Sequence, residues 1–196
     1  TADRRKGVDR ELQSPGTFWE YNDVRVNLAA YALLELWQRP LPAVLKKRVM
    51  DPIGASDAWY WHGYRTSWTE IDGRPVQSVS GGGHWGGGMW ISARDMARFG
   101  LLFLNDGRWQ DRQIFSPSWV EQIRVPTGPE PRYGYMWWLN TDGKMWPGLP
   151  EDSYAALGSG GNVIWIDPED NLIVVVRWID RDHVTEFLKR VRASVR

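Results

Sequence analysis

The C-terminal end of the chain places the strongest constraint on the fold. The runs "NVIWID" and "NLIVVVRWI" are separated only by Pro168, Glu169 and Asp170, which is the pattern of two antiparallel strands joined by a turn. The second run is apolar at nearly every position and predicts a central strand covered on both faces. From His183 onward, apolar residues recur at helical spacing and predict a C-terminal helix over this sheet. The chain is therefore expected to form a mixed α and β fold around its closing hairpin.

Helices are expected before this sheet. Asp23 can cap a helix from about Val24 to Gln38, and because its apolar residues recur on more than one face, we expect it to be mostly buried. Ser92-Ala93-Arg94-Asp95 has the form of a capping box that opens another helix. Ser116, followed by a proline at the first helical position, opens a further one. The run "YGYMWWL" after it is expected to be a strand.

The middle of the chain gives a weaker signal. Residues 60 to 90 are rich in glycine, tryptophan and serine, include "SGGGHWGGG", and have too little periodicity to predict an element. We interpret residues 60–83 as a functional loop or a family-variable insertion. The sequence has no internal repeat and no low-complexity linker, so residues 1–196 are expected to belong to one α/β unit.

Composition argues against several kinds of partner. Lysine and arginine balance aspartate and glutamate at 24 each, so no net charge draws the chain to nucleic acid. With no cysteine, the chain can form neither disulfides nor thiolate metal sites, but this does not indicate a compartment. His62, His84 and His183 are far apart and show no metal-binding spacing, so we expect no metal.

Two segments remain as candidates for chemistry, since no G-x-S-x-G nucleophile motif occurs. One is "PGTFWEYND", which contains Tyr21, and the other is "ALGSGGNVIWIDPE", a glycine-rich entry into a strand. Glycines at 158, 160 and 161 would let a substrate approach backbone N–H groups that stabilise an oxyanion. Both segments also have a structural interpretation, because a tyrosine before a helix can serve packing and glycines before a strand can form a turn.

Four segments, taken in order, resemble the serine β-lactamase and penicillin-binding-protein superfamily, especially its class C β-lactamase-like esterases and amide hydrolases. "PGTFWEYNDVRVNLAAYALLEL" is similar to the family's P-G-x-x-F-x-Y-S-N segment with its following helix, and "PLPAVLKKRVMDPIGASDAW" to its "PLGM" region. "GGGMWISARDMARFGLLFLNDGRW" and "ALGSGGNVIWIDPEDNLIVVVRW" resemble its later helix and its third motif with two closing strands. The resemblance covers nearly the whole chain apart from residues 60–83. It implies a β-lactamase/transpeptidase-like α/β (α+β) fold, with an antiparallel sheet flanked by helices.

The resemblance also implies roles for individual residues. Tyr21 would be the catalytic base, Asp23 a site-orienting group, Gly158 the third-motif glycine, and the backbone N–H of Ser159 an oxyanion donor. Four further residues are interpreted as lining of the substrate cleft, with core packing as the open alternative: His84, Trp85, Trp137 and Trp138. No cofactor is implied.

The family's serine nucleophile and its lysine form an S-x-x-K motif upstream of the tyrosine segment, yet no serine here has a lysine three positions later. We therefore expect residues 1–196 to be the C-terminal part of a β-lactamase-like domain whose N-terminal segment, with S-x-x-K, is missing. A phenol with a pKa near 10 is only about one part in a thousand ionised at pH 7, so Tyr21 needs a nearby cation to act as a base. The chain alone is accordingly predicted to be inactive.

Two positions depart from the family pattern. Asp23 stands where an asparagine belongs, and Ala156-Leu157-Gly158 stands where Lys or His, Thr or Ser, and Gly are usual. Classical penicillin recognition is therefore not expected. The predicted function is a serine hydrolase that cleaves a small-molecule ester, amide or peptide through an acyl-enzyme. The alternative is a non-catalytic module that holds a ligand in an aromatic cleft.

Overall fold

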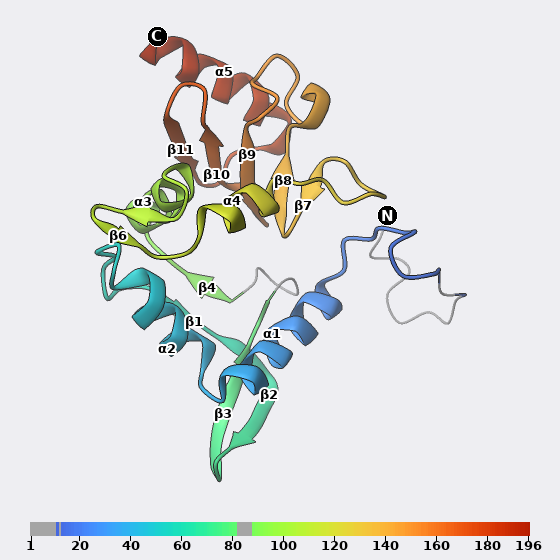
Figure 1. The fold of residues 1–196 in the computed structure, drawn as a ribbon, viewed down its shortest axis with the longest axis vertical. Coiled ribbons are helices and arrows are strands. Elements are labelled where there is room, and N and C mark those ends of the chain that lie inside the picture. Colours follow the sequence, from blue (N-terminus) through green and yellow to red (C-terminus); the bar gives the residue numbers. More distant parts are fainter. Residues whose placement is uncertain (1–10, 12, 82–87) are drawn as a thin grey trace.

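The computed structural model describes residue 11, residues 13–81 and residues 88–196 (Figure 1). None of the helices in these ranges is long and apolar enough to cross a membrane. The N-terminal half contains α1 (Asp23–Trp37), α2 (Leu41–Leu45), the π-helical turn η2 (Lys46–Met50), β1 (Tyr60–Trp61), β2 (Gly63–Ile71), β3 (Arg74–Val79), β4 (Met89–Trp90) and α3 (Ala93–Leu104). The remainder contains β5 (Arg108–Trp109), β6 (Arg112–Gln113), α4 (Pro117–Ile123), β7 (Tyr133–Gly134), β8 (Trp137–Leu139), η3 (Thr141–Gly143), β9 (Tyr154–Gly158), β10 (Asn162–Asp167), β11 (Leu172–Val176), η4 (Arg181–His183) and α5 (Val184–Val195).

The main sheet is antiparallel and has the strand order β11-β10-β9-β8-β7. Its closing hairpin is confirmed, with Ile164 opposite Val175 in β11 and opposite Ala156 in β9. The prediction that the second strand of this hairpin is central was wrong, because β11 is the edge of the sheet among the described residues. An apolar run reports that both faces of a strand are covered, and it does not report whether a strand pairs on both sides.

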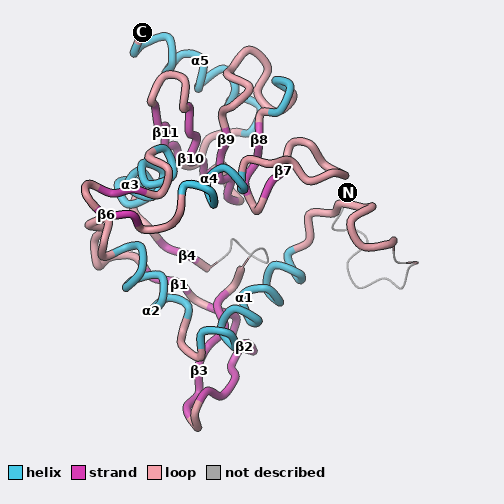
Figure 2. Tube along the Cα trace, viewed as in Figure 1, coloured by secondary structure: helices cyan, strands magenta, loops and turns pink. Residues whose placement is uncertain are grey.

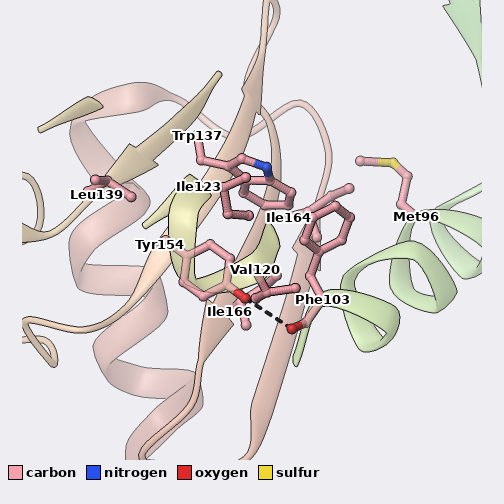
Figure 3. Packing of buried hydrophobic residues seen from close by; sticks show 9 residues of the cluster. All are labelled: Met96, Phe103, Val120, Ile123, Trp137, Leu139, Tyr154, Ile164 and Ile166. Carbon is pink, nitrogen blue, oxygen red and sulfur yellow. Dashed lines mark hydrogen bonds between the residues drawn. The ribbon is translucent and has the colours of Figure 1, made fainter. Parts of the chain in front are cut away.

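Each face of the sheet packs against helices, because successive side chains of a strand point to opposite faces. On one face, Ile164 and Ile166 of β10 join residues of α3 and α4, and the Tyr154 hydroxyl donates a hydrogen bond of 3.3 Å to the carbonyl of Phe103 (Figure 3). On the other face, Trp165 packs with residues of α5. The predicted C-terminal helix over the sheet is therefore confirmed as α5.

Helix α1 forms where the sequence predicts it, but two details of the prediction were wrong. Its N-cap is Asn22, whose side-chain oxygen accepts from the N–H of Arg25, and not Asp23. Only Ala30 and Leu34 are buried, against Ile71 and Val79 of the β2–β3 hairpin among others. Most of the apolar residues on its other sides are exposed, because no described element covers them.

The two other helix starts agree with the sequence. Ser92 caps α3 by accepting from the N–H of Asp95, and the Ser92 hydroxyl donates to the Asp95 carboxylate at 2.8 Å. Pro117 occupies the first helical position of α4, with Ser116 as the N-cap. The start of α3 is predictable because its cap is made within one helical turn, and the start of α4 because proline is favoured at the first helical position. The side chain of Ser116 forms no capping hydrogen bond.

Two segments contain more turns or strands than the sequence indicated. Residues 60–83, interpreted as a loop or insertion, contain the antiparallel hairpin of β2 and β3, whose register shifts between Gly63 and Trp68. This hairpin extends away from the main sheet with α1 and α2 beside it (Figures 1 and 2). The run "YGYMWWL" forms two strands instead of one, because the chain reverses at Tyr135 and Met136, where Met136 has a φ of 67°. Tyr133 then pairs with Trp138.

Candidate active site

Tyr21 lies in an aromatic cluster that connects the segment before α1 to the β7–β8 hairpin. Its ring stacks on Trp138, with centroids 5.9 Å apart and planes at 25°, and meets Tyr133 edge-on at 6.2 Å. Trp19 contacts all three rings, at centroid distances of 5.5 to 6.4 Å. Tyr21 is nevertheless 42% exposed. The ring is therefore held by packing, while a large part of the side chain stays open to solvent.

Tyr133 is the less exposed phenol of this cluster. Burial raises its pKa, and the nearby Tyr21 phenol raises that pKa further because two phenolates would repel each other. Tyr133 therefore stays protonated at neutral pH and is an uncharged member of the aromatic cluster. Sequence reasoning missed Tyr133, although its place two residues before a turn in an aromatic run was visible.

The glycine-rich turn lies one strand away from this cluster. Trp138 pairs with Ala155 of β9, and β9 ends at Gly158, which pairs with Asn162 at the start of β10. The side-chain amide of Asn162 donates to the carbonyl of Ser159 at 2.8 Å and so fixes the turn between the strands. The backbone N–H predicted as an oxyanion donor thus belongs to a turn braced by a side chain.

Gly161 makes this turn possible. It has a φ of 74°, and a Cβ atom at this position would lie 1.8 Å from the carbonyl oxygen of Ile179. Only glycine fits both the left-handed backbone and this close approach. The turn is therefore packed directly against the segment that follows β11.

Asp23 occupies the first helical position of α1, two residues after Tyr21. A carboxylate at this position is stabilised by the partial positive charge of the helix N-terminus. The side chain of the neighbouring Asn22 caps the helix. Asp23 is thus held at the helix start beside the segment that carries Tyr21.

The segment that precedes residues 82–87 meets the same helix. The N–H of Gly81 donates to the side-chain oxygen of Asn27 in α1 at 3.0 Å, and a Cβ on Gly81 would lie 2.5 Å from the carbonyl oxygen of Val26. Because Asn27 is one helical turn from Asp23, the end of the β2–β3 hairpin lies close to the start of α1.

The four tryptophan and histidine positions interpreted as cleft lining have different outcomes. Trp138 carries the ring on which Tyr21 stacks. Trp137 is 7% exposed and packs against Phe103 and Tyr154 in the core, so the alternative of core packing describes it (Figure 3). Neighbouring strand residues face opposite sides of a sheet, which is why the two tryptophans separate. His84 and Trp85 lie outside the described residues.

In the described part of the chain, no group of three or more histidine, cysteine, aspartate or glutamate residues is arranged to hold a metal ion. Among the described residues, the phenols of Tyr21 and Tyr133 meet at the site, and Asp23 lies at the adjoining helix start. A phenol is suited to proton transfer, and the backbone N–H groups of a turn are suited to oxyanion binding.

The antiparallel sheet lies between helices, Tyr21 precedes helix α1, and the glycine-rich turn lies one strand away from the Tyr21 cluster. This is the arrangement of the β-lactamase/transpeptidase fold class. A sequence model described as Beta-lactamase matches residues 6–190. The chain therefore belongs to the Beta-lactamase family.

The chain has low sequence identity to individual relatives. The chain is 25% identical over 134 residues to the 6-aminohexanoate-dimer hydrolase of Paenarthrobacter ureafaciens, a match that covers 59% of this chain and 32% of that protein. It is 20% identical over 195 residues to a candidate D-alanyl-D-alanine carboxypeptidase of Escherichia coli O157:H7, covering 83% and 45%. A beta-lactamase from Mycobacterium bovis has the same fold, with a TM-score of 0.69, 16% identity, and coverage of 96% of this chain and 68% of that one.

The chain spans less than half the length of either of the two sequence relatives. Their names describe hydrolytic enzymes, so the family to which the chain belongs includes hydrolases.

Proposed function

We propose that the complete protein is a serine hydrolase that cleaves an ester or amide bond through an acyl-enzyme. Tyr21 acts as the base, the N–H of Ser159 binds the oxyanion, and Asp23 orients the site. The observation that carries this proposal is the placement of Tyr21, which is 42% exposed and stacked on Trp138 in the strand next to β9.

The serine nucleophile and its lysine are proposed to come from outside residues 1–196, because no S-x-x-K motif occurs among these. Tyrosine needs such a cation, since lowering a phenol pKa by about three units corresponds to about 4 kcal/mol of differential stabilisation. The 196 residues alone are therefore expected to be inactive. Residues 1–196 would form the C-terminal part of one β-lactamase-like domain.

In the proposed reaction, the serine oxygen attacks the carbonyl carbon while its proton passes to the phenolate of Tyr21. The N–H of Ser159 donates to the oxyanion of the tetrahedral intermediate. The intermediate collapses, the leaving amine or alkoxide takes the proton from Tyr21, and an acyl-serine is left. Water attacks the acyl-serine and gives a proton to Tyr21. The serine oxygen then leaves with that proton, and the carboxylic acid is released.

The substrate is proposed to be a small ester, amide or peptide. Support comes from the names of the two sequence relatives, which act on a 6-aminohexanoate dimer and on a D-alanyl-D-alanine terminus. The reaction as proposed requires no metal or cofactor.

A non-catalytic ligand-binding module is the second candidate. It is favoured by Ala156, which stands where the family carries a cation, and by the lack of S-x-x-K in these 196 residues. A binder of this kind would use the aromatic cluster around Tyr21 and Trp138, in which Tyr21 is exposed.

A fluorophosphonate probe applied to the complete protein separates the two candidates. The hydrolase is expected to be labelled on the serine of an S-x-x-K motif, as identified by mass spectrometry of the labelled peptide. Tyr21→Phe is expected to slow labelling by about 100-fold or more, the usual effect of losing a catalytic base. Tyr135→Phe is the matched control, because this tyrosine is exposed on the β7–β8 turn and is bonded to Gln122. A protein that is not labelled, or Tyr21→Phe labelled at the wild-type rate, would contradict the proposal.

A further inference from the structure

Arg177 follows β11 directly and is held at the end of the sheet where the glycine-rich turn lies. Its Nε donates to the side-chain oxygen of Asn162 at 3.2 Å, and its Nη1 donates to the carbonyl oxygen of Ile91 at 3.2 Å. These bonds join three segments, since Ile91 follows β4 and Asn162 begins β10. An arginine tied to two other segments has a defined position although it is exposed.

The side chain of Asn162 links this guanidinium to the proposed oxyanion turn. One end of its amide donates to the carbonyl of Ser159 at 2.8 Å, and the other end accepts from Arg177. Two hydrogen bonds and one amide group therefore separate Arg177 from Ser159. Any movement of Asn162 would shift both groups together.

The charge of Arg177 has no carboxylate partner among the described residues, since both of its hydrogen-bond acceptors are neutral. Arg192 and Arg196, by contrast, pair with carboxylates of the β10–β11 turn. A guanidinium has five N–H donors, and only two of them are used by these bonds. The ring of Trp178 lies 5.9 Å from the guanidinium carbon and covers one side of it.

We propose that Arg177 binds a carboxylate of the substrate. A fixed, exposed and unneutralised guanidinium is suited to carboxylates, which it can bind through two parallel hydrogen bonds. The substrates are then esters or amides that carry a carboxylate a few bonds from the cleaved carbonyl. Asn162 is a positioning residue, because it holds the guanidinium of Arg177 at a fixed position relative to the oxyanion turn. This inference rests on the proposed function.

The test compares two esters with acyl chains of the same length, mono-4-nitrophenyl adipate, which carries a carboxylate, and 4-nitrophenyl hexanoate, which does not. The complete protein is assayed, and the readout is the ratio of the KM for the adipate ester to the KM for the hexanoate ester. Arg177→Gln is expected to raise this ratio about tenfold, the size of a lost charge-assisted hydrogen bond at an exposed site. A purely structural role of Arg177 would change both KM values alike and leave the ratio unaltered.

Two further variants control for packing and for general charge. Arg177→Lys keeps the charge and is expected to recover part of the preference for the adipate ester. Arg112→Gln removes an exposed arginine of the β5–β6 hairpin that forms no ion pair with another described residue, and it is expected to keep the wild-type ratio. A wild-type ratio in Arg177→Gln, or the same rise in Arg112→Gln, would overturn the inference while the proposed function stands.

Binding of free adipate provides a readout that does not depend on turnover. Isothermal titration calorimetry of the complete protein is expected to show adipate binding, and Arg177→Gln is expected to weaken the Kd about tenfold. If neither ester is cleaved, the proposed function fails and this titration still decides the role of Arg177. Equal Kd values in the two proteins, or no adipate binding by the wild type, would overturn the proposed role of Arg177 in binding a carboxylate.

Discussion

The ring of Tyr21 lies flat against that of Trp138, with centroids 5.9 Å apart and planes at 25°. This contact joins the segment before α1 to the second strand of the β7–β8 hairpin. Stacking restrains the ring of Tyr21 without burying its side chain, which is what a group that exchanges protons with a substrate requires.

Substitution of the two neighbouring tryptophans should separate support of the site from support of the core. Trp137→Ala is expected to lower the free energy of unfolding by about 3 to 5 kcal/mol, because a core ring is lost from the face that α3 and α4 cover. Trp138→Ala is expected to cost less stability but to slow probe labelling about tenfold, because near-attack geometry depends on the placement of Tyr21.

Urea unfolding and labelling rates of both variants measure these effects in the complete protein. Trp68→Ala serves as the control, since Trp68 is 58% exposed on the β2–β3 hairpin and its loss should leave both quantities close to wild type. A larger labelling defect in Trp137→Ala than in Trp138→Ala, at a temperature where both are folded, would contradict the assignment.

Gly161→Ala should distort the turn that carries the proposed oxyanion donor. The added methyl group would lie 1.8 Å from the carbonyl oxygen of Ile179, so the backbone has to move. We expect probe labelling to fall about 100-fold, the usual consequence of losing an oxyanion donor. Gly73→Ala is a matched control, because Gly73 also has a positive φ but has open space around its Cβ position. Similar labelling rates for both variants would contradict the role of the turn.

Asp95 should make the stability of the protein depend on pH in the acidic range. Burial disfavours its charge, but hydrogen bonds from the hydroxyl and N–H of Ser56 and from Ser92, together with Arg98, outweigh burial and lower its pKa below the ordinary 3.8. A carboxyl group with a lowered folded pKa stabilises the fold above its unfolded pKa and loses this contribution as the pH falls.

Asp95→Asn is therefore expected to lower the free energy of unfolding by about 1 to 3 kcal/mol at pH 7. The gap between variant and wild type should narrow as the pH falls below about 4, where Asp95 of the unfolded chain becomes protonated. Urea unfolding at a series of pH values measures this gap. A gap that stays constant down to pH 3 would contradict the proposed network.

Arg192 of helix α5 neutralises the buried carboxylate of Asp167 at the end of β10. Asp167 has no exposed surface, burial raises its pKa, and Arg192 donates to it at 2.9 Å. Arg192→Gln leaves this carboxylate without its cation, so the free energy of unfolding is expected to fall by about 3 kcal/mol at pH 7. The loss of unfolding free energy in Arg192→Gln should shrink as the pH falls through the raised pKa of Asp167, because the neutral carboxyl group needs no cation.

Thermal and urea unfolding of this variant can be compared with Arg190→Gln. Arg190 pairs with Glu186 on the surface of α5, where removing an ion pair should change stability by less than about 1 kcal/mol. Equal losses in the two variants would show that Arg192 is no more than a surface charge.

Local patterns were sufficient for the elements that residues close in sequence determine. The closing hairpin follows from two apolar runs around a short turn, and the start of α3 follows from Ser92 and Asp95 within one helical turn. The sequence did not predict that α1 would be so exposed, because an apolar pattern does not reveal whether another segment covers it. For the same reason it placed β11 in the centre of the sheet instead of at its edge.

The sequence by itself determined the family resemblance, the positions of Tyr21 and the glycine turn, and the two apolar runs of the closing hairpin. Only the tertiary structure decided that Tyr21 stacks on Trp138, that Trp137 belongs to the core, and that Arg177 is tied to Ser159 through Asn162. These relationships depend on strand order, on register and on the face to which each side chain points. Apart from the short-range bond between Asn162 and Ser159, they join residues far apart in the chain, and no local spacing encodes such contacts.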